Sequence, residues 1–416
     1  MKKLIILALI TAAMLPVYAK GTREATGTQG SSKVVLTMGS WRTDDAVQMN
    51  KFLAEYQKIK PNVEIQFRPV NPPEYNATVR LQLESGTGPD LMYARSYATG
   101  QELFNAGYFA DCTDIPGVKE NFVASNLAPW QMPDGKTVFA VPFAAVSHAV
   151  YYNQDIFIKE GLSVPQTWED FLTLCKTLQQ KGYTPLANGV ADEWDILEVF
   201  FLALVPNYVG GSAERLQYET GVKHFNDAAF TACFQAMKDS APYLPKGFES
   251  VTYNDSQVLF STQQAVMVID GSWSIEAYPS LPFEWSVFAV PAPQGNPNRI
   301  TFHPDLAITY NRATKYPQEC RDFLAWLASR EGATLASENL PTGYFPMINF
   351  PITLSDQHAN AFLALNTGKE TDARFVWPKL MDLYAPLNQA VIKVLKGEQT
   401  PSQAAAAIEA EAVKYR

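Results

Sequence analysis

Three observations predict an α/β fold built from two or more lobes. From residue 34 onward, apolar runs of strand length alternate with amphipathic stretches of helical period. The chain has 416 residues, which is more than one typical hydrophobic core holds. Its composition, 47% hydrophobic and 18% charged, is that of an ordinary globular protein. Together these features indicate a multi-lobed protein in which helices pack on sheets.

The alternation begins with a continuous apolar run over 34–38, which suits a central strand buried on both faces. Residues 47–59 then carry apolar side chains at helical spacing, and Pro61 ends that helix. Residues 63–67 alternate between apolar and polar as a second strand. Strand, helix and strand in this order predict a right-handed crossover unit.

The same pattern continues with a helix over 74–84, a turn at 86–89 and a short apolar strand at 91–93. We therefore expect one α/β lobe to extend to about residue 142. Helical periodicity returns in four later segments, 168–181, 194–205, 227–240 and 318–330. The alanine-rich segment QAAAAIEAEAVKY near the C-terminus also favours a helix.

The N-terminus predicts export. Lys2 and Lys3 precede an apolar run from Leu4 to Leu15, and small residues lead up to Ala19. This is the pattern of a secretory signal peptide over residues 1–19, because the apolar run is shorter than the roughly 20 residues that span a bilayer. A lipid-anchored form would carry a cysteine directly after the cleavage point, but the first cysteine is Cys112. We expect a periplasmic or secreted protein.

Residues 20–33 are small and polar, and they predict a flexible leader. The formal net charge is −9, which argues against a nucleic-acid partner because phosphates demand basic patches. In an oxidising compartment the cysteines allow three disulfide pairings, while their wide spacing is equally typical of buried free thiols. These cysteines are Cys112, Cys175, Cys233 and Cys320.

Signatures of catalysis are absent from the sequence. Gly135, Lys136 and Thr137 resemble the end of a phosphate-binding loop, but Trp130 stands where the first glycine should be. There is no H-E-x-x-H and no G-x-S-x-G, and the four histidines lie far apart. We therefore expect no metal and no cofactor. A glycosidase stays possible, since its two carboxylates leave no local signature.

Four stretches carry a family resemblance through their order and spacing. They are LQLESGTGPDLMY, then GKTVFAVPFAAVSHAVYYNQDIFIKEGLSVPQTWEDF, then FSTQQAVMVIDGSW, and finally AITYNRATKYPQECRDFLAWLASREG with the later LKGEQTPSQAAA. Together they resemble the family 1 extracellular solute-binding proteins, whose best known members bind maltose and related sugars. The resemblance covers essentially the whole chain from about Val34.

That resemblance implies a two-lobed periplasmic binding protein fold of type II, with the ligand in a cleft between lobes joined by several crossings. The implied N-terminal lobe is 34–142 plus 303–332, and the C-terminal lobe is 143–302 plus 333–416. The implied function is non-catalytic: a monomer that binds a sugar or oligosaccharide and delivers it to the membrane subunits of an ABC importer. Open α/β sheets bind ligands at the carboxyl ends of their strands, which agrees with this location.

A sugar site needs flat aromatic rings for the apolar C–H faces and fixed polar groups for the hydroxyls. Trp41 and Arg42 follow the first strand at its carboxyl end, although Trp41 would equally suit packing between lobes. Arg95 and Tyr97 follow the strand at 91–93, where the family places loop residues that contact ligand. The tryptophan and aspartate of maltose-binding relatives are not matched in that loop. Asp90 is a further candidate, or a cap of the strand turn.

The remaining candidates come from the second half of the pattern. His148 lies just past the first crossing, and Asp192 and Trp194 precede a predicted helix for which Asp192 would also serve as N-cap. Trp273, in the segment DGSW, is the main candidate because the matching tryptophan in similar proteins stacks on sugar. The C-terminal part adds Tyr344 and Arg374, with Trp377 as an alternative to Arg374.

Two other functions remain open from the sequence. A secreted carbohydrate-active enzyme would share the aromatic richness and the acidic balance. A binding protein for another solute, such as a polyol or an anionic sugar derivative, would use Arg42, Arg95 and Arg374 in the cleft.

Overall fold

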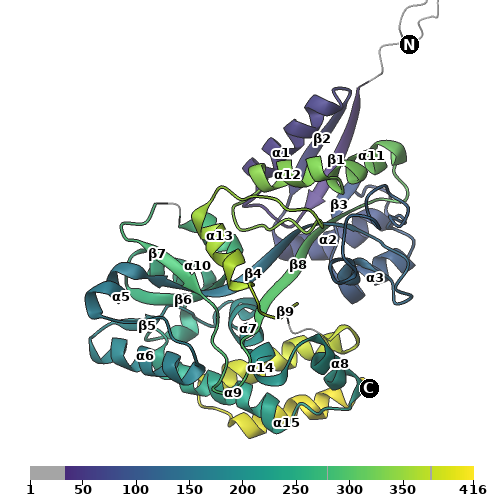
Figure 1. Cartoon of the computed structure of the whole chain (residues 1–416). Helices are drawn as coiled ribbons and strands as arrows, with labels where there is room; N and C mark the ends of the chain where they lie inside the picture. Colours follow the sequence, from purple (N-terminus) through teal and green to yellow (C-terminus); the bar gives the residue numbers. More distant parts are fainter. Residues whose placement is uncertain (1–32, 279, 375–376) are drawn as a thin grey trace, which may run out of the picture.

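The computed structural model describes residues 33–278, 280–374 and 377–416. They form a mixed nine-stranded sheet surrounded by helices (Figure 1). The strand order is β2-β1-β3-β8-β4-β6-β5, with β7 paired to β4 and β9 paired to β8. The predicted signal peptide over 1–19, and nearly all of the predicted leader over 20–33, lie outside the described residues.

The first part of the chain forms the predicted strand–helix–strand unit. Its elements are β1 (Val34–Ser40), α1 (Ala46–Ile59), β2 (Val63–Pro69), α2 (Pro72–Glu84), β3 (Leu91–Tyr93), α3 (Tyr97–Asn105), α4 (Ala124–Leu127) and η1 (Ala128–Trp130). β1 pairs in parallel with both β2 and β3. α1 buries Met49, Phe52, Leu53 and Tyr56, an apolar stripe of helical period that packs toward α12. The predicted strand–helix–strand unit with parallel strands is confirmed.

Two long antiparallel strands connect the two ends of the molecule. β4 (Val141–Asn153) and β8 (Ile300–Tyr310) pair with each other, and the register shifts on either side of Ala144. At about 3.3 Å per residue, β4 spans roughly 43 Å. It therefore extends past its pairing with β8 to pair with β6, whereas β8 pairs with β3 at the other end. Figure 1 shows both strands running between an upper and a lower group of elements.

The second group surrounds the other end of β4. Its strands are β5 (Thr184–Leu186), β6 (Ala265–Gly271), β7 (Trp285–Phe288) and β9 (Thr371–Asp372). Its helices up to β8 are α5 (Gln154–Glu160), α6 (Trp168–Gln180), η2 (Asp195–Phe201), α7 (Leu202–Val209), α8 (Ser212–Thr220), α9 (Ala228–Ser240), η3 (Ala241–Tyr243), η4 (Phe248–Ser250), α10 (Tyr253–Ser261) and η5 (Ser272–Ala277). After β8 the chain returns to the first unit with α11 (Pro317–Leu327) and α12 (Arg330–Asn339), which Figure 1 shows beside α1. It then continues with α13 (Gln357–Leu365), η6 (Pro378–Leu383), α14 (Tyr384–Leu395) and α15 (Pro401–Ala412).

Buried apolar side chains form two clusters, and the first of them extends from the first unit into β6 and β7 of the second group. One cluster contains Leu36, Phe52 and Tyr93 from the first unit, and the other contains Phe171, Phe200 and Val391 from the second. Trp273 packs against both clusters. The exact lobe boundaries given above stay a prediction, although β4 and β8 begin close to the predicted boundaries at 142–143 and 302–303.

Two predicted helices were wrong in detail. The segment predicted as one helix over 194–205 begins as a π-helical turn, η2, and continues as α7. The helix predicted over 318–330 ends at Leu327, and α12 begins anew after Ser329, whose side chain accepts from the Gly332 amide. A Cβ on Gly332 would collide with the Trp326 carbonyl, so glycine permits this tight junction between α11 and α12.

All four cysteines are buried and free. Their thiols therefore act as small apolar groups of the core, as the wide spacing allowed. Across the described ranges, no single helix has the length and apolar character to cross a bilayer, while the bent pair Asp195–Val209 and Ser212–Thr220 meets that test jointly, by length and composition only.

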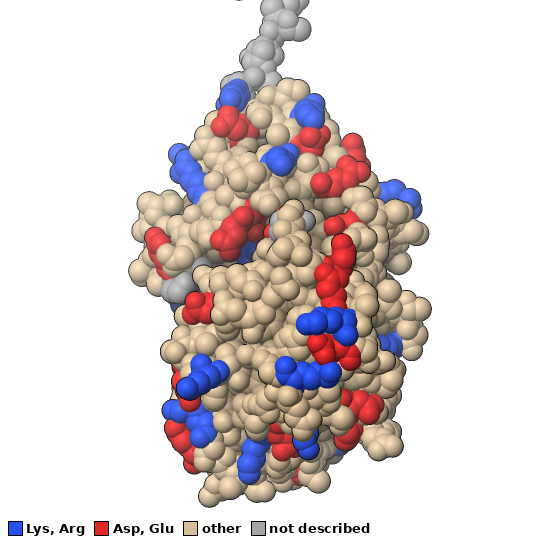
Figure 2. All heavy atoms as spheres, turned by 90° about the vertical axis from the view of Figure 1, so that its left-hand side faces the viewer, with Lys and Arg blue, Asp and Glu red and all other residues tan. Residues whose placement is uncertain are grey.

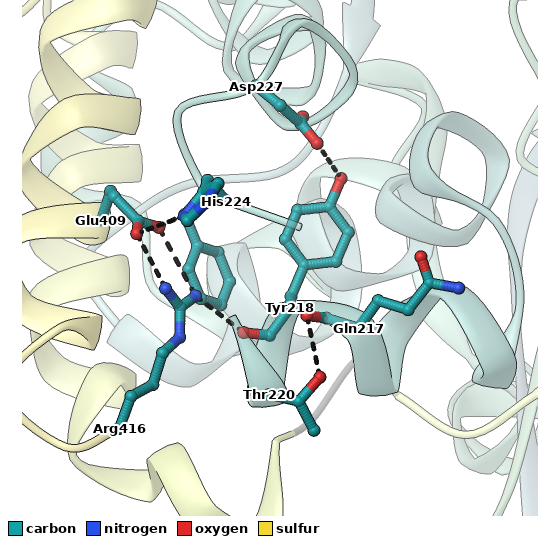
Figure 3. Close-up of polar contacts among 8 residues, drawn as sticks. Gln217, Tyr218, Thr220, His224, Asp227, Glu409 and Arg416 are labelled. Carbon is teal, nitrogen blue, oxygen red and sulfur yellow. Dashed lines mark hydrogen bonds and ion pairs between the residues drawn. The ribbon is translucent and has the colours of Figure 1, made fainter. Parts of the chain in front are cut away.

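The C-terminal residue is held against the second group of elements (Figure 3). The guanidinium of Arg416 donates to Glu409 at 2.8 Å and to the Tyr218 carbonyl at 2.7 Å. Glu409 also accepts from the Phe225 amide at 2.7 Å and lies 2.9 Å from the ring of His224. These contacts attach α15 and the chain end to the segment that follows α8.

Candidate ligand-binding site

Trp41 lies at the carboxyl end of β1, as predicted, but its ring is already covered. Only 8% of it is exposed, and Tyr75 and Tyr93 contact it edge-on at centroid distances of 5.6 and 5.3 Å. The guanidinium of Arg95 lies 3.6 Å above the ring centroid, and its Nε also donates to Asn76. Trp41 and Arg95 thus form one stacked pair.

Arg42, the next predicted residue, belongs to a second contact beside Trp41. Its guanidinium donates twice to Asp45, at 2.7 and 2.8 Å, in the bidentate geometry that favours arginine. The hydroxyl of Tyr344 donates to the same carboxylate at 3.1 Å, which joins residues 299 positions apart. Asp45 is buried and was not predicted, because a lone aspartate before a helix gives no signal of such a role.

Tyr97 follows Arg95 in an unusual backbone conformation. Its φ is 53°, in the left-handed region that residues other than glycine seldom adopt. Burial raises the pKa of the Tyr97 phenol, and the charges of Arg215, Asp372 and Arg374 act on it as well. Tyr97 therefore faces elements of the second group, although it starts a helix of the first.

His148, Trp194 and Trp273 lie together at the end of the sheet where β4 and β6 meet. The ring of His148 contacts Trp273 edge-on at 5.4 Å, and Trp194 lies 6.5 Å from Trp273. The Trp273 ring rests on the backbone of Gly271, where a Cβ would overlap it. The site prediction therefore brings together three residues from distant parts of the chain.

Tyr253 holds this aromatic cluster in place, and it was not among the residues predicted for the site. Its hydroxyl accepts from the Trp273 indole at 2.7 Å, and its ring lies 4.6 Å from Trp194. Asp192 accepts from the Tyr253 amide at 2.8 Å. The Asp192 side chain therefore does not cap the helix that follows it in sequence; it accepts from the first amide of α10, whose N-cap is Thr252.

Two buried carboxyl groups lie behind the aromatic cluster. Asp270 accepts from the Tyr253 hydroxyl at 3.2 Å and from the Gly271 amide at 2.7 Å. Burial raises the pKa of Asp270 to about 7, although these donors oppose the shift. Burial also raises the pKa of Asp195 well above its usual value, and neither of its oxygens has a hydrogen-bond partner in the described structure.

Arg374 links the second group to β8. It forms ion pairs with Glu198 on η2 and, at 3.2 Å, with Asp305 on β8. Glu198 accepts from the hydroxyl of Tyr384 at 2.6 Å. Trp377, the alternative candidate, is instead buried in the core, where its indole donates to the Arg215 carbonyl and its ring contacts Phe225 edge-on.

Asp305 acts electrostatically on arginine candidates from both groups of elements. Burial would lower the pKa of Arg42, but acidic groups around it, Asp305 among them, raise it. Burial lowers the pKa of Arg95, against the opposing charges of Asp305 and Glu198. Burial also opposes the charged form of Arg374, whose pKa its two carboxylate partners raise. The candidates of both groups therefore converge where β8 crosses the molecule.

Asp90 lies outside this convergence. Its carboxylate accepts from the amide and the hydroxyl of Thr37 and from the hydroxyl of Thr314. The strand-turn interpretation is therefore the correct one. Among residues 33–278, 280–374 and 377–416, no three His, Cys, Asp or Glu side chains are placed to hold a metal ion.

Comparison with known proteins agrees with this geometry. A family model of bacterial extracellular solute-binding proteins matches residues 39–334. The multiple sugar-binding protein of Streptococcus mutans is 24% identical over 310 residues, 71% of each chain. The sn-glycerol-3-phosphate-binding periplasmic protein UgpB of Rhizobium meliloti is 23% identical over 313 residues, 73% of this chain and 68% of that protein.

Solved structures share the fold. The bacterial solute receptor AcbH, described as having an exclusive substrate preference for β-D-galactopyranose, superposes with a TM-score of 0.81 at 19% identity. The match covers 92% of this chain and 100% of that receptor. With a family match over most of its length and a two-lobed periplasmic binding protein fold, the chain belongs to the bacterial extracellular solute-binding proteins.

Proposed function

We propose that this protein is the substrate-binding component of an ABC importer, which binds a sugar or oligosaccharide and delivers it to the membrane subunits. The observation that carries the proposal is Trp273, a partly exposed indole that contacts both cores beside Trp194. A flat and partly exposed aromatic ring suits the apolar face of a pyranose. The names of several relatives support a carbohydrate ligand.

The ligand-contacting residues in this proposal come from both lobes. They are Trp41, Arg42, Arg95, Tyr97, His148, Asp192, Trp194, Trp273, Tyr344 and Arg374. An open form exposes the two half-sites, and the ligand bridges them and stabilises the closed form, which the membrane subunits recognise. To shift such an equilibrium almost completely, a ligand must favour the closed form by about 5 kcal/mol. A micromolar affinity, near −8 kcal/mol, is sufficient.

The setting of this function is extracytoplasmic. We propose that residues 1–19 direct export and that the mature monomer acts in the periplasm or outside the cell, without catalysis and without a nucleic-acid partner. On the face drawn in Figure 2, basic side chains are scattered among acidic ones, which is unlike the basic stripe that nucleic-acid binding uses.

An anionic ligand is the first rival, and the glycerol-phosphate-binding relative makes it concrete. Arg95 stacks on Trp41 and donates to the neutral side chain of Asn76, but the other two arginine candidates argue for a neutral ligand. Arg42 is paired with Asp45, and Arg374 is paired with Glu198 and Asp305, so neither guanidinium offers an uncompensated charge. A bound phosphate would have to displace these carboxylates from Arg42 or Arg374 before it could pair with the guanidinium group.

A carbohydrate-active enzyme is the second rival, because a carboxyl with a raised pKa, such as Asp270, is what a general acid requires. Its surroundings favour a supporting role, since Asp270 is 1% exposed and its oxygens accept from Tyr253 and Gly271. Hydrolysis of an oligosaccharide by the pure protein, abolished in Asp195→Asn and Asp270→Asn variants, would establish the enzyme.

A thermal-shift screen of the mature protein tests the proposal. The panel contains galactose, raffinose, maltotriose, glycerol, sn-glycerol 3-phosphate and spermidine. At 100 times its Kd, a bound sugar should raise Tm by about 3 °C. Trp273→Ala should weaken binding of that sugar at least about tenfold, whereas Tyr415→Ala, at the exposed C-terminus, should not. A shift with sn-glycerol 3-phosphate alone would favour the anionic rival.

A further inference from the structure

A pair of histidines lies on the two strands that connect the lobes. His148 is on β4 and His303 is on β8, and their ring centroids are 5.5 Å apart. The pairing of Val146 with His303 and of Ser147 with Phe302 places His148 opposite Thr301. His303 and Thr301 are two residues apart on β8, so all three side chains belong to one face of the crossing.

These side chains are buried without the partners that polar groups need. Each of the two rings is 2% exposed. Within the described residues, neither nitrogen of His148, nor Nε2 of His303, nor the hydroxyl of Thr301 has a hydrogen-bond partner. His303 Nδ1 lies 3.1 Å from the Pro304 carbonyl. The face is therefore a polar layer shut away from water, directly beneath the Trp273 edge.

The surroundings oppose a positive charge on either ring. Burial lowers the pKa of His148 well below its usual value, and the nearby His303 and Arg374 lower it further. The backbone of Val199 raises this pKa slightly. Burial, with Arg374, lowers the pKa of His303 in the same way. Burial therefore favours the neutral form of both rings.

Among the described residues around the pair, no unpaired carboxylate is placed to stabilise a positive charge on the two histidines. The acidic groups on the elements around the pair are Glu198 and Asp195 on η2, Asp305 on β8, Asp270 at the end of β6, and Asp372 on β9, which pairs with β8 at Thr301. Asp372 forms an ion pair with Arg215. Glu198 and Asp305 are paired with Arg374. Burial raises the pKa of Asp195 and Asp270, so these two carboxyl groups retain protons to higher pH than ordinary ones. If opening of the lobes exposed Asp195 and Asp270, their raised pKa values in the closed form would favour closure at acid pH. The histidines have the opposite effect on closure.

We propose that His148 and His303 couple closure of the lobes, and with it ligand binding, to the release of protons from the strand crossing. This inference rests on the proposed function and adds its regulation. An open form hydrates the rings and lets them titrate near 6.5, whereas the closed form excludes their charge. Closure is then fully favoured above about pH 6.5 and weakens as the pH falls below it. Acid releases the ligand.

The test compares sugar affinity at two pH values by titration calorimetry. The probe is galactose, raffinose or maltotriose, whichever gives the largest thermal shift. For the unmodified mature protein, Kd should rise about tenfold per histidine between about pH 7.5 and pH 5.5. His148→Gln and His303→Gln should each remove about tenfold of that ratio, and the double variant should bind almost equally at both pH values. His224→Gln, at an exposed histidine, should keep the full ratio.

The outcomes separate this inference from the proposed function. A sugar that binds with the same Kd at both pH values, or variants that keep the full ratio, would overturn the histidine coupling and leave sugar binding intact. Asp270→Asn should not lower the ratio, because a carboxyl with a raised pKa acts with the opposite sign; a lower ratio would overturn the assignment of the pH response to the histidines. If no sugar on the panel binds, the radius of gyration of the free protein decides: it should increase on acidification in the unmodified chain but not in the double variant, and an unchanged radius overturns the coupling.

Discussion

The indole of Trp273 lies flat on the backbone of Gly271, so close that a Cβ at position 271 would overlap the six-membered ring. The φ of Gly271 is −85°, which any residue adopts, so the glycine is required by the approach of the ring and not by the backbone. This contact sets the plane of the indole, and the Tyr253 hydroxyl fixes its nitrogen.

Gly271→Ala should therefore displace Trp273. We expect a loss of about 1–3 kcal/mol in the free energy of unfolding, as for other overpacked sites, and sugar affinity at least about tenfold weaker. Urea unfolding and calorimetry measure the two effects. Gly247→Ala is the control: its φ of 75° makes the substitution costly for stability, but no atom lies within 4 Å of the new Cβ. Equal affinities for these two variants would contradict the role of the contact.

Arg95 covers Trp41 at 3.6 Å, and the pair predicts a measurable stacking energy. Arg95→Ala should lower the free energy of unfolding by about 1 kcal/mol, since the guanidinium is largely buried against the ring. Arg95→Lys should recover only part of that loss, because an ammonium group keeps the charge but not the planar contact. Arg68→Ala, which removes an exposed arginine of β2, should be neutral. Identical stabilities of the alanine and lysine variants would rule out stacking as the source.

Arg416 predicts a pH-dependent contribution of the chain end (Figure 3). Burial opposes ionisation of Glu409, but His224, the Phe225 amide and Arg416 together lower its pKa below the usual 4.5. A lowered carboxyl pKa stabilises the fold above about pH 4.5 and ceases to do so as the pH falls further. Arg416→Ala should cost about 2 kcal/mol near pH 7 and much less near pH 3.

Urea unfolding at several pH values measures this difference. Lys414→Ala is the matched control, because Lys414 pairs with Glu411 on the exposed side of the same chain end. A cost for Arg416→Ala that stays constant from pH 7 to pH 3 would show that Glu409 is not the partner that matters.

Local periodicity was sufficient to predict most of the first lobe. The apolar run over 34–38 and the helical spacing over 47–59 each involve neighbouring residues, so their pattern is complete in the sequence, and β1 and α1 form where expected. The segment at 194–205 was harder, because its first turn is π-helical and an apolar stretch does not distinguish a π turn from an α turn.

Only part of the candidate site could be predicted from the sequence. Trp273 and Trp194 were predicted from their motifs, and the structure places them together. Tyr253, Asp305 and His303 were missed as site residues, because their roles depend on the register between distant strands and on which helix start meets which loop. Such pairings are set by tertiary packing and leave no local signal.

β4 has a consequence for how the molecule resists denaturation. A single unbroken strand contributes Val141 to one hydrophobic core and Val150 to the other, and β8 is paired along much of it. If one half unfolds, strands of the other half lose backbone hydrogen-bond partners. The protein should therefore melt in a single cooperative step, and damage to one core should lower the midpoint observed by a probe in the other.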